Sequence, residues 1–457
     1  MVQTNMLEND TLDVLGQQPD MYKLYTQICC IYPVSDTSVH STIIGTLRRG
    51  LDRLAEAFPW LAGEVINKGS STNNSGVYRI IHSRTIPFVV KDLRKDAFAP
   101  TMSALRENNF PMTMLDEGLI ASCLTINTPG NTVGLAAESA PIFAVQANFI
   151  TDGLMITIVG QHNVMDMTGQ DSVIKLMSKA CHGIQFTEEE VFVGNMDRSR
   201  TIPLLDDDYT PGHELDEQMI KPQESTEQEF PVNATWAYVT FSPTALQTLK
   251  SLATSVTLPS GFVSTDDTVC AFIWQCVSRA RIPRLTPTTK STFARAVDVR
   301  QRLGVPTSYP GMLQSMTYNS NTLQDLAEQP LGAIASELRR QLDPEVRDLV
   351  HNVRALATYL TRSPDKTKVS FTASVEIPTG IALSSWARIK CYDLDFNLGL
   401  GLPESVRRPA FIPVESLIYI MPKSPQGEMA VAICLRDEDW KQLRADEEFG
   451  KYTTYIG

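Results

Sequence analysis

Two strands, a tight turn and a helix follow one another between residues 142 and 180, and this unit constrains the fold more than any other stretch. Ile142 to Ile150 and Leu154 to Val159 are apolar runs rich in β-branched residues, which predicts two buried strands. The residues between them, Thr151-Asp152-Gly153, favour a tight turn that pairs the strands. After the second strand, apolar residues recur at helical spacing, at Val173, Leu176, Met177 and Ala180.

His162 lies where the second strand ends and the helix is about to begin, and Asp166 follows four residues later. A rigid strand end can hold an imidazole still and leave it open to a cleft, as a general base requires. Thr168 and Asp171 look like the capping pair of the following helix. From this window alone, a satisfied histidine in a loop, with Asp166 as an ordinary turn or cap residue, is an equally good interpretation.

The chain's charge and cysteines limit its partners. A formal net charge of -12 and a pI near 5.1 argue against nucleic acid or an anionic membrane surface as the main partner. The eight cysteines are scattered without zinc spacing, so we expect no metal site and reduced thiols in a cytoplasmic protein. No secretory signal is visible, and no apolar run approaches the roughly 18 residues that span a bilayer.

The length of 457 residues fits two domains, and strand and helix patterns mix in both halves. We therefore expect an α/β fold with mixed β-sheets flanked by helices. Residues 204–232 are acidic and rich in proline, which predicts a solvated crossover without a metal, between domains at 1–203 and 233–457. Part of the second domain's chain could pack into the first domain. Residues 39–58 predict an amphipathic helix, 77–90 a pair of strands, and 128–141 an exposed hairpin loop.

Several further motifs accompany His162-x-x-x-Asp166 in one order along the chain. They are Phe58-Pro59-Trp60-Leu61-Ala62-Gly63, Val297-Asp298-Val299-Arg300, Ser384-Ser385-Trp386 and Asp395-Phe396-Asn397-Leu398-Gly399. This order resembles the BAHD superfamily of CoA-dependent acyltransferases. Ser264-Thr265-Asp266-Asp267, Val406-Arg407-Arg408-Pro409 and Arg436-Asp437-Glu438-Asp439 narrow the resemblance to the fungal trichothecene 3-O-acetyltransferases, over nearly the whole chain.

The resemblance implies two domains of the chloramphenicol acetyltransferase type with an active-site tunnel between them. Acetyl-CoA, as co-substrate, would enter from one side and the C3 hydroxyl of a trichothecene from the other, in a monomer without a metal. His162 would take the proton from the acceptor hydroxyl as its oxygen attacks the thioester. A ternary complex supplies the orientation, so no covalent acyl-enzyme is needed.

The same resemblance gives roles to the other site residues. Asp166 would pair with Arg300 and fix the loop geometry, although Arg300 could also be an exposed cation at a strand end. The indole of Trp386 would donate to the oxyanion, helped by Ser384 or Ser385; the alternative is a plain core tryptophan.

Two more groups complete the expected site. The segment from Asp395 to Gly399 would be structural, and Asn397, at a position where the family usually has glycine, can still adopt a left-handed backbone conformation. For the phosphates of CoA we expect the densest basic cluster of the second half, unless its members are solvated surface charges. That cluster contains Arg279, Arg281, Arg284 and Lys290.

Two rival functions stay open at this point. One is the same chemistry on another hydroxyl or another fungal metabolite, because acceptor identity depends on the tunnel lining. The other is a non-catalytic binder of the metabolite. An intact His162 with Asp166 argues against the binder, which has no need of a base.

Overall fold

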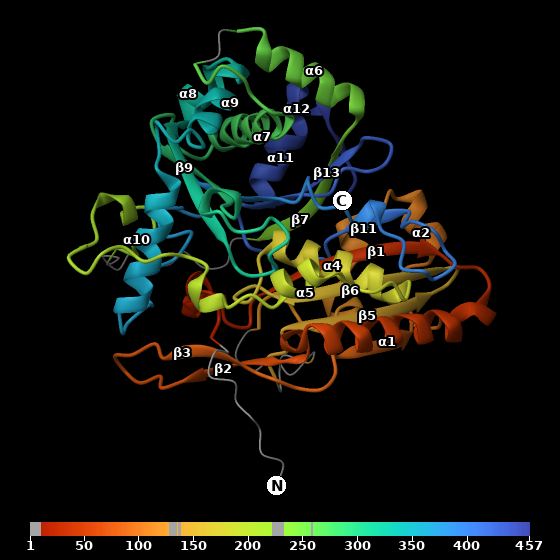
Figure 1. The fold of residues 1–457 in the computed structure, drawn as a ribbon. Helices are drawn as coiled ribbons and strands as arrows, with labels where there is room; N and C mark the ends of the chain where they lie inside the picture. Colours follow the sequence, from red (N-terminus) through yellow and green to blue (C-terminus); the bar gives the residue numbers. More distant parts are fainter. Residues whose placement is uncertain (1–10, 128–134, 136–138, 222–232, 257–258) are drawn as a thin grey trace.

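The computed structural model describes residues 11–127, 135, 139–221, 233–256 and 259–457. In this part of the chain the strands form a five-stranded, a seven-stranded and a two-stranded sheet, with helices packed against the two larger ones (Figure 1). The expected α/β class with mixed sheets is confirmed. None of the described helices is long and apolar enough to cross a bilayer.

The five-stranded sheet contains the hairpin that precedes His162. Its strands, in spatial order, are β11 (Ser405–Arg407), β1 (Tyr25–Pro33), β6 (Gly153–Gln161), β5 (Phe143–Ile150) and β4 (Phe88–Asp92). β5 and β6 pair antiparallel as predicted, with Asp152 in the turn at a φ of 58°. β11 comes from the last quarter of the chain, so the two halves of the sequence share this sheet.

Helices cover both faces of this sheet. On one face, Ile28, Cys30 and Tyr32 of β1 share a core with α1 (His40–Ala57) and α4 (Met167–Cys181). On the other face, Cys29 and Ile31 pack with α2 (Met102–Glu107). This alternation follows from the two-residue period of a strand. It buries β1 on both sides and leaves its ends as the places where polar groups can gather.

The seven-stranded sheet belongs to the second half. Its strands, in spatial order, are β14 (Thr454–Tyr455), β7 (Ala234–Phe241), β13 (Met429–Arg436), β12 (Leu417–Ile420), β10 (Ile381–Ser385), β8 (Lys290–Asp298) and β9 (Gln314–Thr322). β10 runs parallel to both β8 and β12, so the carboxyl ends of these strands meet at one edge. β12 and β13 are consecutive in the chain and pair antiparallel.

The two sheets share a core where they meet. Val239 and Val431 point toward the helices of the second half, whereas their neighbours Tyr238 and Ala432 belong to the core of the first sheet. The helices on the outer face are α6 (Pro243–Thr254), α7 (Thr265–Arg281), α8 (Leu323–Glu328), α9 (Leu331–Arg340), α11 (Asp437–Ala445) and α12 (Glu447–Tyr452). Figure 1 shows them gathered on the side away from the first sheet.

Several local expectations are corrected. β3 (Val77–Ile81) pairs with β2 (Glu64–Lys68) in the small sheet, whereas β4 joins β5, so residues 77–90 are not one pair of strands. The cap of α4 is Asp166, whose side chain accepts from the Gly169 N–H, and not the pair Thr168 and Asp171. The remaining described helices are α3 (Glu117–Ile120), α5 (Glu188–Gly194) and α10 (Leu349–Arg362).

The acidic crossover is partly visible. Residues 204–221 pack beside α10, where the Arg362 guanidinium donates to the carbonyls of Leu205, Asp206 and Tyr209. Residues 222–232 lie outside the described part, as does most of the expected hairpin loop at 128–141.

Candidate active site

His162 follows the last residue of β6, in the turn that leads into α4. Its backbone N–H donates to the Leu24 carbonyl at 2.7 Å, which fastens the turn to the beginning of β1. Its Nδ1 lies 3.3 Å from the carbonyl oxygen of Met165. Because a carbonyl oxygen only accepts, this contact places the ring proton on Nδ1 and leaves Nε2 unprotonated.

The surroundings of His162 keep its ring neutral. Burial is the largest influence and lowers its pKa from the ordinary value of 6.5, while the charge of Asp166 acts in the opposite direction. The cation of Arg408 adds to the lowering. Since the net pKa shift is downward, the imidazole is neutral at pH 7 and can accept a proton.

Asp166 and Arg300 form a buried pair with two parallel hydrogen bonds. Nη1 and Nη2 of Arg300 donate to Oδ2 and Oδ1 of Asp166, both at 2.9 Å, and Arg300 is 0% exposed. The carboxylate also accepts the backbone N–H groups of Gly169 and Leu313, each at 2.8 Å. Asp166 therefore caps α4 and ties the His162 turn to the segment after β8, and the alternative of an exposed Arg300 is excluded.

The Arg300 guanidinium keeps its positive charge beside Asp166. Burial acts to lower the pKa of Arg300, but the charge of Asp166 and the bonds to it outweigh burial, so the net pKa shift is upward. The guanidinium thus stays protonated.

Trp386 follows β10 and is buried, at 1% exposure. Its indole Nε1–H donates to the Ser384 hydroxyl oxygen at 3.1 Å, so the predicted oxyanion donor already has an acceptor. Ser385 donates to the carboxylate of Asp266. Of the three groups, the hydroxyl hydrogen of Ser384 is the one that no hydrogen bond within the described residues uses.

A cavity of about 650 Å³ adjoins the Asp166 turn. It is bounded by the beginnings of α4 and α7 and by the adjacent ends of β8 and β10, with Asp166, Met167, Asp266, Asp298, Ser384 and Ser385 in its wall. The cavity therefore joins the carboxyl ends of parallel strands to the start of the helix that His162 precedes. No cluster of three or more potential metal-ligating His, Cys, Asp or Glu side chains occurs among the described residues.

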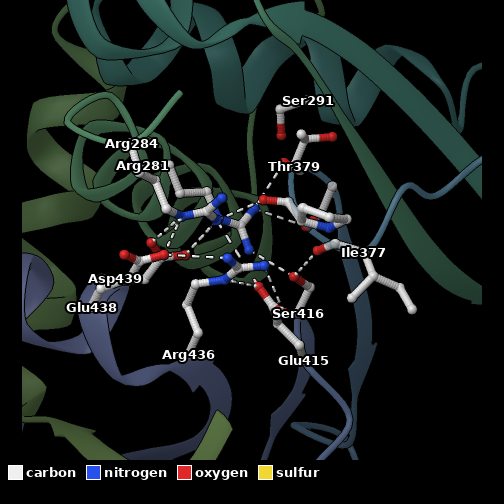
Figure 2. A network of polar contacts seen from close by, with 12 residues as sticks. Arg281, Arg284, Ser291, Ile377, Thr379, Glu415, Ser416, Arg436, Glu438 and Asp439 are labelled. Carbon is white, nitrogen blue, oxygen red and sulfur yellow. Dashed lines mark hydrogen bonds and ion pairs between the residues drawn. The ribbon is translucent and has the colours of Figure 1, made fainter. Parts of the chain in front are cut away.

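The predicted role of Arg281 in binding the phosphates of CoA is wrong. This residue is 0% exposed, and its guanidinium donates to Asp439 at 3.1 Å and to Ser416 at 2.6 Å, and also to the Thr379 and Gly380 carbonyls. Figure 2 shows the network, in which Arg281, Arg284 and Arg436 surround Asp439 and Glu415. A residue so enclosed cannot reach a phosphate.

The other members of the basic cluster also lie apart from the cavity. Arg279 pairs with Asp446 at 2.8 Å and with Glu448 at 3.0 Å. Lys290 is exposed at the beginning of β8, whereas the cavity touches the end of that strand. The basic residues in the cavity wall are instead Lys175, Arg295, Arg339 and Arg388.

The segment from Asp395 to Gly399 braces the far end of α4. The Asp395 carbonyl accepts from Ser178 at 2.6 Å and lies 3.0 Å from Nε2 of His182. Asn397 has a φ of 55°, which confirms the left-handed conformation expected there, and Gly399 has a φ of 74°. This bracing holds the helix that follows His162.

Arg408 was given no role from the sequence. It is 1% exposed, and its guanidinium lies 4.3 Å from the ring centroid of Phe411, 4.7 Å from that of Tyr419 and 5.7 Å from that of Trp386. Its Nη2 donates to the Thr125 hydroxyl at 3.2 Å. Its sequence signal was its place in the Val406-Arg407-Arg408-Pro409 motif, which does not show that the side chain is buried.

Comparison with known proteins agrees with this geometry. Residues 122–449 match the transferase family, and residues 24–181 match the trichothecene 3-O-acetyltransferase-like N-terminal domain. A trichothecene 3-O-acetyltransferase from Saccharomyces cerevisiae is 56% identical over 459 residues, which cover 99% of this chain and 97% of that protein. The chain belongs to the transferase family.

Two further similar proteins are informative. The structure of TRI101 from F. graminearum complexed with coenzyme A and deoxynivalenol has a TM-score of 0.93 and 47% identity, covering 98% of this chain and 99% of that chain. The O-acetyltransferase dmxR13 from Cryptosporiopsis sp. is 49% identical, over 98% of this chain and 97% of its own length. The resemblance predicted from the motifs is thus confirmed.

Proposed function

We propose that the protein transfers the acetyl group of acetyl-CoA to the C3 hydroxyl of a trichothecene. The observation that carries this proposal is the neutral His162 at the end of β6, with its proton on Nδ1 and Nε2 unprotonated. The choice of acceptor is supported by the transferase family member at 56% identity and by the TRI101 complex with deoxynivalenol.

His162 acts as the general base. Nε2 takes the proton from the acceptor hydroxyl as the hydroxyl oxygen attacks the acetyl carbon, and the imidazolium later returns that proton to the departing CoA sulfur. The Met165 carbonyl, at 3.3 Å from Nδ1, holds the Nδ1 proton throughout, so Nε2 is the nitrogen that gains and loses a proton.

Ser384 stabilises the oxyanion that forms on the acetyl carbonyl. Trp386 donates its indole hydrogen to the Ser384 oxygen, and this directs the Ser384 hydroxyl hydrogen away from Trp386. Ser384 also lines the cavity, so its hydrogen can reach a bound thioester. A preorganised donor of this kind contributes about 3 kcal/mol to lowering the barrier. In this proposal Trp386 orients the oxyanion donor and Asp166, through Arg300, holds the turn.

The remaining expectations are proposals of the same kind. We propose a cytoplasmic monomer with domains at 1–203 and 233–457 and a crossover at 204–232. The cytoplasmic location is supported by the eight cysteines, which are all buried and form no disulfide in the described part of the chain.

The test is a thiol-release assay with acetyl-CoA and a 3-hydroxy trichothecene, followed by mass spectrometry and NMR of the product. The expected result is a gain of one acetyl group, located at C3. Thiol release with other alcohols only would retain the chemistry and discard the acceptor. The similarity to dmxR13, at 49% identity, makes acetylation of a different fungal metabolite the second candidate. Binding of trichothecenes without thiol release from any alcohol would favour a non-catalytic binder.

A further inference from the structure

Arg408 and His162 follow the two strands that flank β1. β6 and β11 both pair antiparallel with β1, and both run toward its first residues. His162 directly follows β6, which ends opposite Tyr25, and Arg408 directly follows β11, which ends opposite Cys29. Neighbouring strands lie about 4.8 Å apart, so two strands separated by β1 are roughly 10 Å apart. The two residues are close enough for the cation of Arg408 to act on the pKa of His162.

The Arg408 guanidinium is buried without being satisfied. Its Nε and Nη1 have no hydrogen-bond acceptor among the described residues, and no carboxylate there forms an ion pair with it. The nearby carboxylate of Glu117 accepts instead from the Gln27 side chain and the Thr125 N–H, both at 2.7 Å. A buried cation with two unused donors is destabilising on its own, and native structures keep such groups where function needs them.

The side chains around Arg408 in the described residues use only one of its three side-chain nitrogens as a donor. Aromatic rings of Phe411, Tyr419 and Trp386 lie within 5.7 Å, and Thr125 takes Nη2. The Nε and Nη1 hydrogens lie in the plane of the guanidinium but point to different sides of it, so each of these nitrogens needs an acceptor of its own. The aromatic rings favour an uncharged, largely apolar molecule that presents an oxygen acceptor.

Trp386 stands between Arg408 and the cavity. Its indole hydrogen is bound to Ser384, which lines the cavity, while its ring is one of those beside Arg408. Arg408 itself is not part of the cavity wall. Trp386 thus contacts both Ser384, the proposed oxyanion donor, and Arg408.

We propose that Arg408 donates from Nε or Nη1 to an uncharged oxygen of the acceptor and so orients the acceptor hydroxyl toward His162. This inference rests on the proposed acyl transfer and adds a specificity-determining residue to it. An acceptor that lacks the oxygen leaves that donor buried and unpaired, so it is rejected.

The charge of Arg408 gives a second readout of its role, which is independent of acceptor binding. The groups that act on His162 are its burial and Arg408, which lower its pKa, and Asp166 and the Met165 and His162 backbone, which raise it. Removing the cation therefore shifts the acidic limb of the rate profile to higher pH.

The experiment compares R408M, R408K and the matched control R407M. Arg407 is also buried, at 5% exposure, but it donates to the Asn109 and Phe110 carbonyls. We expect R408M to raise the acceptor KM, and the acceptor Kd by calorimetry without CoA, by roughly 10- to 100-fold. The KM for acetyl-CoA should stay within about twofold, and R407M should resemble the parent protein in all three constants.

R408K keeps the charge and loses the planar fork. It should therefore weaken acceptor binding while leaving the acidic limb in place, and it serves if R408M does not fold. An unchanged acceptor Kd in a folded R408M or R408K would overturn the inference. If the parent protein does not acetylate trichothecenes, the proposed function fails instead, and the same comparison is made with the alcohol that does release thiol.

Discussion

Arg281 and Arg408 are both buried and both within a few residues of a strand or helix end, yet their surroundings are opposite. Arg281 lies in a structural network with Arg284, Asp439 and Ser416 (Figure 2), where its guanidinium has a carboxylate and three other oxygens. Arg408 lies beside Trp386, which binds Ser384, and its charge acts on His162. Two of its nitrogens have no acceptor within the described residues. This difference separates a network that holds the fold from a cation to which we assign a ligand.

The comparison predicts that the structural network controls stability and not turnover. Asp439 accepts from Arg281 and twice from Arg284, at 2.6 to 3.1 Å. Asp439→Ala leaves the buried Arg281 unpaired, so we expect the free energy of unfolding in urea to fall by about 3–5 kcal/mol. The kcat of the folded fraction should not change. Glu438→Ala is the control: its side chain is 58% exposed, and its removal should cost about 0–1 kcal/mol.

A change at Ser384, the proposed oxyanion donor, should affect turnover more than stability. Ser384→Ala removes the hydroxyl hydrogen assigned to the oxyanion, and we expect kcat to fall about 100-fold. The free energy of unfolding should fall by only about 1 kcal/mol, for the lost bond from Trp386. Ser384→Thr, which keeps a hydroxyl, should retain more activity. A Ser384→Ala protein with normal kcat would remove the serine from the mechanism.

Asp166 belongs to both classes, because it is fully satisfied and holds the catalytic turn. Asp166→Asn breaks the charged bonds to Arg300, and we expect a loss of about 1.5–3 kcal/mol in the free energy of unfolding. Since the His162 turn then loosens, kcat should fall by about tenfold at saturating substrate. Stability loss with unchanged kcat would place Asp166 with the structural network alone.

The smallest effect concerns pH. Because the pKa of His162 lies below 6.5, kcat/KM should keep more than half of its plateau value at pH 6.5 and reach half of it only at lower pH. Stability should follow the same direction: as the pH drops below 6.5 the unfolded chain binds the proton first, so the folded state is progressively destabilised. An acidic limb centred above 6.5 would contradict the buried, neutral imidazole.

Local sequence patterns predicted much of this fold and part of the site. The β5–β6 hairpin depends on neighbouring residues, and α1 on apolar residues at helical spacing, so both could be read from the chain. The pair of Asp166 with Arg300 followed from the family resemblance. The conformation of Asn397 followed from its side chain.

What the sequence could not give depends on distant partners. Arg281 looks like surface charge until Asp439, from α11, and Ser416, from beside β12, are placed against it. Arg408 becomes conspicuous only when β11 joins the first sheet and leaves two of its nitrogens without acceptors. The residues after β3 were predicted to pair with it, because no local pattern in the sequence shows that β4 pairs with β5 instead.

The most direct test of the central claim is the turnover of His162→Ala, measured by thiol release with acetyl-CoA and a 3-hydroxy trichothecene. The loss of a general base typically lowers the rate by about 10²–10⁴-fold. We expect a loss of that size, with the urea midpoint and the acceptor Kd close to those of the parent protein. A His162→Ala protein that acetylates the trichothecene at the parent rate would contradict the account.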